Sequence, residues 1–418
     1  MKQYNSYKDS GVKWIGKIPG NWKIIPNKYI MHKIKEICPI YNGEDILSLS
    51  VKGVNVRDLD AGGKMPATFN GYQRLHKGNL LMCLFDMDVT PCCIGRINNA
   101  GLTSPAYSQF VVHKGADRDF FYYYYLMLDN TKELVHLAKN LRHTITEDQL
   151  GNIKIPLPPL PEQQAIADFL DAKCAEIDGL LADLDAEVKT LAEYKKSIIA
   201  ETVTHGLNPN VPMKQSGIPW AETIPEHWKI DKGKYYFELR RTKGNPHNLE
   251  LMSPTQKFGV IPQSQLEGVV LVKEKTDLNS FRTIRPGDFC ISLRSFQGGF
   301  EYSRYEGVVS PAYQVFYPIK PIVDGYFKYM FKSDGFISYI NTFSMSLRDG
   351  KNIPFEDFGN SYIPIPPDEE QEAIATYLDE KCAAIDQAIS DKQTQIETLK
   401  SYRASLIYEY VTGKKQVI

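Results

Sequence analysis

Few residues of this chain have the types and spacing that enzymatic chemistry requires. Asp86 and Asp88 form a D-x-D pair of the kind that holds a divalent cation in nucleases, but the matching region of the second half has Leu293 and Ser295 instead. There is no glycine-rich phosphate loop and no H-E-x-x-H motif, and the eight histidines lack metal-ligand spacing. The seven cysteines include no C-x-x-C pair, which disfavours a disulfide framework or a zinc site and favours a cytoplasmic protein. We expect no catalytic residue and no metal site.

Two turns, Ser104–Tyr107 and Ser310–Tyr313, share the sequence SPAY. They are similar to the Pro-Pro-Tyr loop with which amino-methyltransferases stack a flipped base on an aromatic ring. One alternative is therefore a self-contained DNA adenine methyltransferase. No glycine-rich site for a methyl donor accompanies either copy, and a structural turn is the simpler interpretation.

Basic side chains among polar and aromatic neighbours are better candidates for function. Arginine is the commonest reader of guanine edges in the major groove, and both lysine and arginine bind phosphates. The DNA-binding candidates are Arg57, Lys64, Arg74, Lys77, Arg96, Arg142, His143, Arg240, Arg241, Lys243, Arg282, Arg294, Arg348 and Lys351. For each of them, ordinary surface charge is the alternative interpretation.

Two long stretches of the sequence occur twice. Lys8–Ile24 returns as Lys214–Ile230 with nine of seventeen positions identical, and the stretch that starts at Ile155 returns from Ile363. The offsets of 206 and 208 residues indicate that a whole unit has been duplicated. A length of 418 residues also predicts more than one domain. Two similar halves suggest a partner that also comes in two halves.

Each copy ends in a helix whose apolar residues alternate in steps of three and four. A period of 3.5 residues is typical of a coiled coil, so the two helices most simply pair with each other. The predicted seam contains Leu170, Ile177, Leu181, Leu184, Val188, Leu191, Ile198, Leu378, Ile385, Ile389, Ile396, Leu399 and Leu406. Lys195 and Arg403 stand at the same late seam position, and Asp368 with Gln371 resembles a capping box. Two separate helices that each pack on their own block are the alternative.

The segment before each long helix, here called a block, is predicted to contain both strands and helices, with strands in the majority. Short buried helices are expected at the aromatic stretches 119–127 and 325–331. Each block is mildly basic and each helical segment is acidic. The net charges of residues 1–154, 155–206, 207–362 and 363–418 are +6, −6, +3 and −4. This pattern favours a polyanion at the blocks. The sequence has no run of 18 apolar residues, so it predicts no membrane span.

The order of block, Pro-rich lead-in with Glu-Gln, long helix and repeat resembles the DNA-specificity subunit of Type I restriction–modification systems. The resemblance covers essentially the whole chain. The motifs that carry it are SGVKWIGKIPGNWKI with SGIPWAETIPEHWKI, PLPPLPEQQAIADFLD with PIPPDEEQEAIATYLD, and THGLNP after the first helix.

This resemblance implies an α+β fold with two mixed α/β target-recognition domains. They would be separated by a long antiparallel coiled coil of the two repeated helices, with pseudo-twofold symmetry. Target-recognition domain 1 would span residues 1–154, helical arm 1 residues 155–206, target-recognition domain 2 residues 207–362 and helical arm 2 residues 363–418. Each domain would read a few base pairs of a bipartite double-stranded DNA site.

The resemblance also implies the partners. Two methyltransferase subunits would dock on the arms and their flanks, and a restriction (motor) subunit would join them. AdoMet, ATP and Mg would be bound by those subunits and no cofactor by this chain, which would be non-catalytic. A coiled-coil scaffold that joins two proteins without touching DNA is a second alternative.

Overall fold

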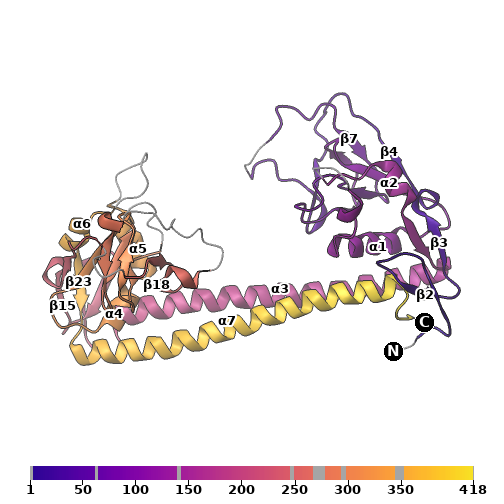
Figure 1. Cartoon of the computed structure of the whole chain (residues 1–418). Coiled ribbons are helices and arrows are strands. Elements are labelled where there is room, and N and C mark those ends of the chain that lie inside the picture. The colour runs from indigo at the N-terminus through magenta and orange to yellow at the C-terminus, as the bar shows by residue number, and fades with distance from the viewer. Residues whose placement is uncertain are drawn as a thin grey trace. The chain divides into compact units, whose positions relative to one another are not determined.

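The computed structural model describes residues 3–61, 65–138, 143–244, 249–266, 278–292, 298–343 and 353–417 (Figure 1). The chain divides into two compact units. Unit 1 consists of Met1–Asp185 and Thr394–Ile418, and unit 2 consists of Ala186–Gln393. Among the described residues, no helix is both long enough and apolar enough to cross a bilayer.

Unit 1 contains a four-stranded antiparallel sheet with the strand order β4-β11-β8-β9. These strands are β4 (Met31–Ile34), β11 (Ser108–Val112), β8 (Leu80–Met82) and β9 (Ile94–Arg96). Helix α1 (Arg118–Asn130) begins at Asp117, whose carboxylate accepts hydrogen bonds from the backbone N–H groups of Asp119 and Phe120. This N-cap satisfies donors that a helix start leaves unpaired.

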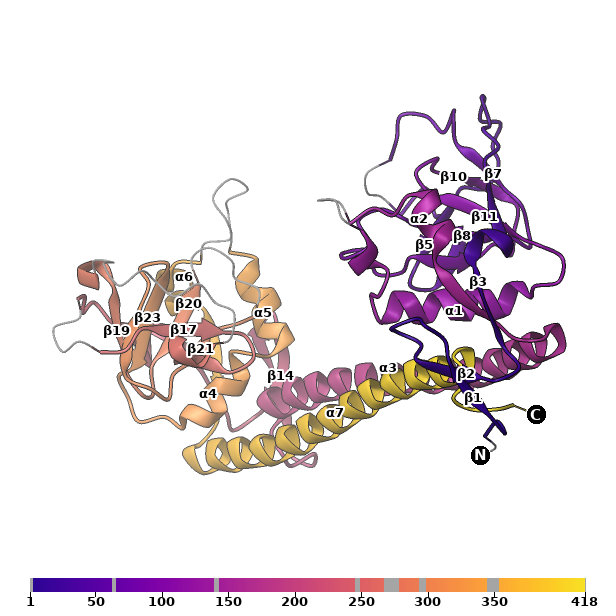
Figure 2. The same cartoon turned by 45° about the vertical axis from the view of Figure 1, so that its right-hand side comes forward.

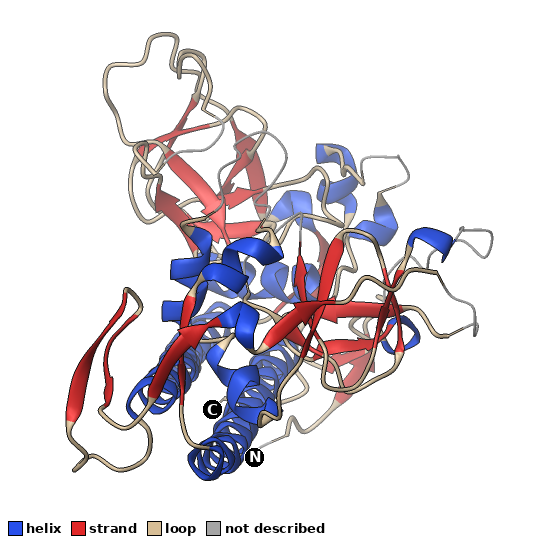
Figure 3. Ribbon diagram, turned by 90° about the vertical axis from the view of Figure 1, so that its left-hand side faces the viewer, coloured by secondary structure: helices blue, strands red, loops and turns tan. Residues whose placement is uncertain are grey.

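The other elements of unit 1 are short paired strands and short helices. Figure 3 shows the strands, helices and loops of the chain by colour. The pairs are β1 (Tyr7–Asp9) with β2 (Lys17–Pro19), β3 (Lys23–Pro26) with β12 (Lys154–Leu157), β5 (Leu47–Ser50) with β6 (Gly53–Val56), and β7 (Gln73–Leu75) with β10 (Gly101–Thr103). The short helices are η1 (Asn27–Tyr29), η2 (Val135–Leu137) and α2 (Glu147–Asn152).

Unit 2 repeats this plan. Its four-stranded sheet has the order β16-β23-β20-β21, built from β16 (Phe237–Leu239), β23 (Tyr313–Pro318), β20 (Phe289–Ser292) and β21 (Glu301–Tyr302). The pairs are β13 (Met213–Ile218) with β14 (Ala221–Pro225), β15 (Lys229–Lys232) with β24 (Tyr362–Ile365), β17 (Met252–Thr255) with β18 (Gly259–Pro262), and β19 (Arg282–Ile284) with β22 (Gly307–Val309). The helices are η3 (Gly233–Tyr235), η4 (Gln263–Gln265), η5 (Leu278–Ser280), α4 (Asp324–Met330), α5 (Asp334–Asn341) and α6 (Phe355–Asn360).

The core of each unit is built around the second tryptophan of the repeated N-terminal motif. Trp22 packs edge-on against Phe120 of α1, with ring centroids 6.3 Å apart. Trp228 packs in the same way against Tyr326 of α4, also at 6.3 Å. All four side chains are buried, and each buried aromatic of this size stabilises a core by roughly 1.5–3 kcal/mol. The helices α1 and α4 confirm the two predicted buried aromatic helices.

Two long helices complete the units (Figures 1 and 2). Helix α3 runs over Leu160–His205 and helix α7 over Asp368–Val411. In unit 1, the Phe169 ring of α3 lies 4.5 Å from the Tyr410 ring of α7, and in each unit the contacts move forward along one helix while they move backward along the other. The helices are therefore paired antiparallel within each unit.

The fold class agrees with the prediction: two mixed domains with strands and two long repeated helices. The four predicted segments differ from the two compact units, however. Leu170 and Cys174 of α3 and Leu406 of α7 belong to the same apolar core as the strands and α1 of unit 1. Because the helix segments share a core with the domain beside them, each unit includes parts of both helices.

Candidate nucleic-acid interface

The paired long helices form the frame to which the domains with the predicted DNA-binding residues are attached. All the predicted seam residues are buried or half-buried, whereas the positions that flank them are mostly exposed. In unit 1 the buried seam residues include Leu170, Ile177 and Leu406, and in unit 2 they include Leu378 and Ile385. A narrow apolar stripe with this periodicity is the geometry of a coiled-coil contact.

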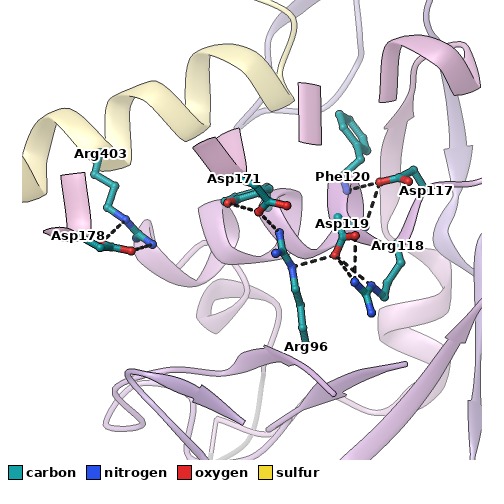
Figure 4. Close-up of polar contacts among 9 residues, drawn as sticks. Arg96, Asp117, Arg118, Asp119, Phe120, Asp171, Asp178 and Arg403 are labelled. Atoms are coloured by element: carbon teal, nitrogen blue, oxygen red, sulfur yellow. Dashed lines mark hydrogen bonds and ion pairs between the residues drawn. The ribbon is translucent and has the colours of Figure 1, made fainter. Parts of the chain in front are cut away.

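Ion pairs cross between the helices beside this seam. Lys195 Nζ lies 2.6 Å from Asp386 Oδ2 in unit 2, where Lys392 also pairs with Glu187. In unit 1, Arg403 Nε lies 3.0 Å from Asp178 Oδ1 (Figure 4). The carboxylates of these pairs are about half exposed, so each pair contributes only about 0–1 kcal/mol, and its main effect is on register and direction.

The glutamate of each lead-in binds the buried tryptophan of its own unit. Trp22 Nε1 donates to Glu162 Oε1 over 3.1 Å, and Trp228 Nε1 donates to Glu370 Oε2 over 2.8 Å. A buried indole N–H needs an acceptor. In each unit, the repeated Trp therefore donates a hydrogen bond to the repeated Glu, although the two residues are far apart in the sequence.

In unit 1, the glutamine of the lead-in ties the long helix to its domain. Gln163 is fully buried; its Nε2 donates to the backbone oxygen of Pro158 over 2.8 Å, and its Oε1 accepts from the backbone N–H of Asp117 over 2.8 Å. The start of α3 is thereby fixed against the start of α1.

The glutamine of unit 2 makes the same two contacts. Gln371 donates to the backbone oxygen of Pro366 over 2.9 Å and accepts from the N–H of Val323 over 3.1 Å. Its side chain is buried and points to the domain, at 3.5 Å from Asp368 Oδ1. The suggested capping box of Asp368 and Gln371 is therefore wrong, because the amide is used to anchor the helix.

Of the predicted DNA-binding residues, Arg96 is held inside unit 1 (Figure 4). Its guanidinium lies 2.9 Å from Asp119 on α1 and 2.7 Å from Asp171 on α3, and it stacks on the ring of Tyr122 at 4.2 Å. Tyr123 Oη also donates to Asp171 over 2.7 Å, and burial raises the pKa of this tyrosine. Only 19% of the Arg96 side chain is exposed, so its geometry favours a structural role in joining α1 to α3.

Arg240 is held in the same manner in unit 2. It makes two hydrogen bonds to Asp288, of 2.6 and 2.7 Å, and covers the Tyr317 ring at 4.4 Å. Burial raises the pKa of Asp288, and the neighbouring guanidinium partly offsets that rise. A bidentate pair that is almost wholly buried leaves this arginine few free donors for a base.

Two further candidates of unit 1 have acidic neighbours. Arg74 lies 3.1 Å from Glu44 and 3.6 Å from Glu36. His143 lies 3.7 Å from Asp88 and has a positive φ of 42°. Both side chains remain partly exposed, so they are still accessible to a ligand.

Three of the predicted DNA-binding residues of unit 2 lie near one bridge between strands. Lys243 pairs with Arg282 across an isolated antiparallel bridge, and Arg241 lies two residues before Lys243. Arg241 and Lys243 are exposed and Arg282 is half-buried. In unit 1, Lys77 is exposed and Arg57 is half-buried. The remaining candidates, Lys64, Arg142, Arg294, Arg348 and Lys351, lie outside the described residues.

The SPAY turns are closed by their own backbones. Tyr107 N–H donates to Ser104 O over 3.2 Å, and Tyr313 N–H donates to Ser310 O over 3.0 Å. In unit 1, Gln73 Nε2 also binds the carbonyls of Ser104 and Tyr107, at 2.9 and 2.8 Å. These contacts fit a structural turn before β11 and β23. Within the described part of the chain, no cluster of three or more His, Cys, Asp or Glu side chains could hold a metal ion.

Comparison with known families decides the identity of this architecture. Residues 97–190 and 229–398 match the family described as Type I restriction modification DNA specificity domain. The chain belongs to this family. The match includes parts of both repeats, and it confirms the resemblance predicted from the repeated motifs.

Individual relatives agree with this Type I specificity assignment. The putative type I restriction enzyme MjaX specificity subunit of Methanocaldococcus jannaschii is 26% identical over 318 residues, which cover 71% of this chain and 68% of the relative. The MjaVIII specificity subunit of the same organism is 27% identical over 285 residues, which cover 64% of this chain and 63% of the relative. The chain thus spans about two thirds of the length of these relatives.

A solved structure shares the fold. It comes from work titled as the structural basis of complex assembly and conformational transition of the type I R-M system, and it matches with a TM-score of 0.67 at 14% identity. The match covers 94% of this chain and 98% of the other. Together the comparisons confirm a DNA-recognition subunit of a Type I system and do not favour the methyltransferase-like or scaffold alternatives.

Sequence reasoning missed the residues that build the frame of this Type I specificity protein. The acidic partners Asp178, Glu187 and Asp386, and the anchors Gln163 and Gln371, were not among the predicted site residues. One signal was present: Gln163 and Gln371 stand 208 residues apart in the repeated lead-in, as do Asp178 and Asp386 in the repeated helix.

Proposed function

We propose that each strand-rich domain of this specificity subunit reads one half of a bipartite double-stranded DNA site. The observation that carries the proposal is the contrast within the duplication. The frame residues that tie domain to helix are the same in both units, whereas the basic loops differ. Loops on a common scaffold are where different sequences are read.

The accessible basic residues fit DNA. In unit 2, a backbone bridge brings Lys243 beside Arg282, and Lys243 and the nearby Arg241 are exposed. In unit 1, Lys77 is exposed at the turn that precedes β8. Such residues neutralise phosphates, and arginine among them can also pair with a guanine edge.

We further propose that this chain is non-catalytic and positions enzymes that are separate chains. Two methyltransferase subunits and a restriction subunit would dock on it, and these would bind AdoMet, ATP and Mg. The exposed acidic flanks of α3 and α7 would contribute to that docking. Methylation of a base requires that it be flipped out of the duplex, a step that belongs to the methyltransferase.

The test is to map methylation by the complex of the full chain with its cognate methyltransferase subunit. We expect a motif of two short specified segments with an unspecified spacer between them. A contiguous motif would contradict the proposal that two domains read independently. AdoMet binding by the full chain alone is the second readout, and measurable binding would contradict the non-catalytic role.

A further inference from the structure

The surface of unit 1 has an exposed tyrosine beside a lysine at the end of a short turn. Lys28 and Tyr29 end the turn η1, and one residue, Ile30, separates this turn from β4. Lys28 Nζ donates to Asn152 Oδ1, the last residue of α2, over 3.3 Å. The Tyr29 side chain is 63% exposed, although burial of such a ring would stabilise a core.

Unit 2 has the same feature with the same residue types. Lys234 and Tyr235 end the turn η3, and one residue, Tyr236, separates this turn from β16. Lys234 Nζ donates to Asn360 Oδ1, the last residue of α6, over 2.9 Å, and Tyr235 is 49% exposed. We call the residues Lys28, Tyr29 and Asn152, and their counterparts Lys234, Tyr235 and Asn360, the two Lys-Tyr patches.

The turn under each patch is fitted closely against the end of its short helix. A Cβ added at Gly151 of α2 would lie 3.4 Å from Lys28 Cβ, and one added at Gly359 of α6 would lie 3.4 Å from Lys234 Cβ. A backbone hydrogen bond of 2.9 Å from Asn27 N–H to Ile153 O closes the first junction. The patches are therefore positioned by packed backbone.

Further basic residues neighbour both patches. In unit 1, the exposed Lys154 of β12 pairs with Pro26, directly before η1. In unit 2, Lys232 lies directly before η3, with its ammonium 5.4 Å from the ring of the exposed Tyr362. The acidic residues of α2, such as Glu147, stand in its first turn, at the other end of the helix from Asn152. Each patch therefore combines an exposed ring with two nearby lysines.

The patches lie at the strand ends away from the SPAY turns. In unit 1, Met31 at the start of β4 pairs with Val112 at the end of β11, while the SPAY turn precedes the start of β11. In unit 2, Phe237 at the start of β16 pairs with Pro318 at the end of β23.

We infer that each Lys-Tyr patch binds one copy of the same protein partner, the methyltransferase subunit. Two DNA half-sites of different sequence would be bound by different residues. The patches instead have identical side chains on both units, which indicates that they bind the same ligand in two copies. Lysines fit an acidic partner surface, and an exposed tyrosine fits an apolar recess, where such residues are frequent binding hot spots. The inference rests on the proposed function, which supplies this partner.

The experiment assembles the full chain with its cognate methyltransferase subunit and counts bound copies by native mass spectrometry. We expect Tyr29→Ala and Tyr235→Ala each to weaken the binding of one copy by about tenfold or more, and the double variant to weaken both. Phe258→Ala is the matched control, because Phe258 is 62% exposed and lies outside the patches. Melting temperatures should stay unchanged, since neither tyrosine is in a core.

Two results would overturn the inference. Undiminished binding of both copies by the double variant would remove the patches from the interface. Undiminished binding together with a weaker salt dependence of DNA affinity would show that the patches contact phosphates instead. Failure of the proposed function has a different signature: the unmodified chain would bind no methyltransferase, or would direct methylation to no bipartite site.

Discussion

Arg403 and Asp178 join the two long helices of unit 1, with Arg403 Nε 3.0 Å from Asp178 Oδ1. Lys195 and Asp386, which stand 208 residues from Arg403 and Asp178 respectively, make the corresponding pair in unit 2 at 2.6 Å. The duplication has thus kept both members of a contact between helices. Each basic seam residue noted in the sequence has a carboxylate partner on the opposite helix.

Charge reversal at this pair should be mildly destabilising. Arg403→Glu places two carboxylates together, and we expect a loss of about 1 kcal/mol or less because the pair is partly exposed. The exchange of both residues, Asp178→Arg with Arg403→Asp, should recover most of the loss. Thermal unfolding at low and high salt measures this, and an effect that salt does not reduce would argue against a charge interaction.

Loss of a lead-in glutamine should cost much more. Gln163→Leu leaves the buried Pro158 carbonyl and the Asp117 N–H without their partner, at a cost of about 1–3 kcal/mol for each unsatisfied group. The neighbouring Gln164 is exposed, so Gln164→Leu is the matched control. Denaturant unfolding of both variants makes the comparison, and equal stability would show that the buried amide does not anchor the helix.

Arg96→Gln should lower stability and leave sequence recognition unchanged. The substitution removes the ion pairs to Asp119 and Asp171, which join α1 to α3. The melting temperature should fall while the methylation motif of the complex stays the same. A changed base preference in one half-site would mean that Arg96 contacts DNA after all.

Arg241→Gln and Lys243→Gln should weaken DNA binding and leave stability unchanged, the reverse of what we expect for Arg96→Gln. Both side chains are exposed, so the melting temperature should hold. For each phosphate contact that is lost, the slope of log affinity against log salt should become shallower by about 0.9. DNA binding measured from low to moderate salt tests this, and slopes equal to that of the unmodified chain would exclude phosphate contacts by both residues.

The stability of unit 2 should depend on pH through Glu301. Burial raises the pKa of this carboxyl from its ordinary value of 4.5 to about 7, although Lys332 lies 2.5 Å away and opposes the rise. Between these two values the folded state binds more protons than the unfolded state, so stability should fall as pH rises from about 4.5 to 7. Glu301→Gln should remove this part of the pH dependence. Denaturant unfolding at several pH values, compared between the variant and the unmodified chain, measures the difference.

The repeat, the fold class and the helix pair could be predicted because their signals are local or periodic. Seam residues such as Leu170 and Leu378 recur at heptad spacing, which predicts their burial against a partner helix, and both are buried. The ion pairs could not be predicted in the same way. Many exposed carboxylates line α3, and only the register of the two helices decides that Asp178 and Glu187 face a cation.

The candidate DNA-binding residues show the same limit. The sequence marks Arg96 and Arg241 alike as candidates, since each is an arginine within a strand-rich block. Arg96 is held inside because Asp119 and Asp171 reach it from α1 and α3, which are distant in sequence. Arg241, by contrast, is exposed. Burial of an arginine depends on partners that no local pattern shows.

The glutamine anchors affect how such a protein can change over time. The domain groups that Gln163 and Gln371 bind belong to the main chain, namely the carbonyls of Pro158 and Pro366 and the amides of Asp117 and Val323. Every residue offers a backbone carbonyl, and every residue except proline offers a backbone N–H, so substitutions elsewhere in the domain leave the attachment intact. New target preferences can therefore arise by mutation of surface loops without any compensating change at the joint.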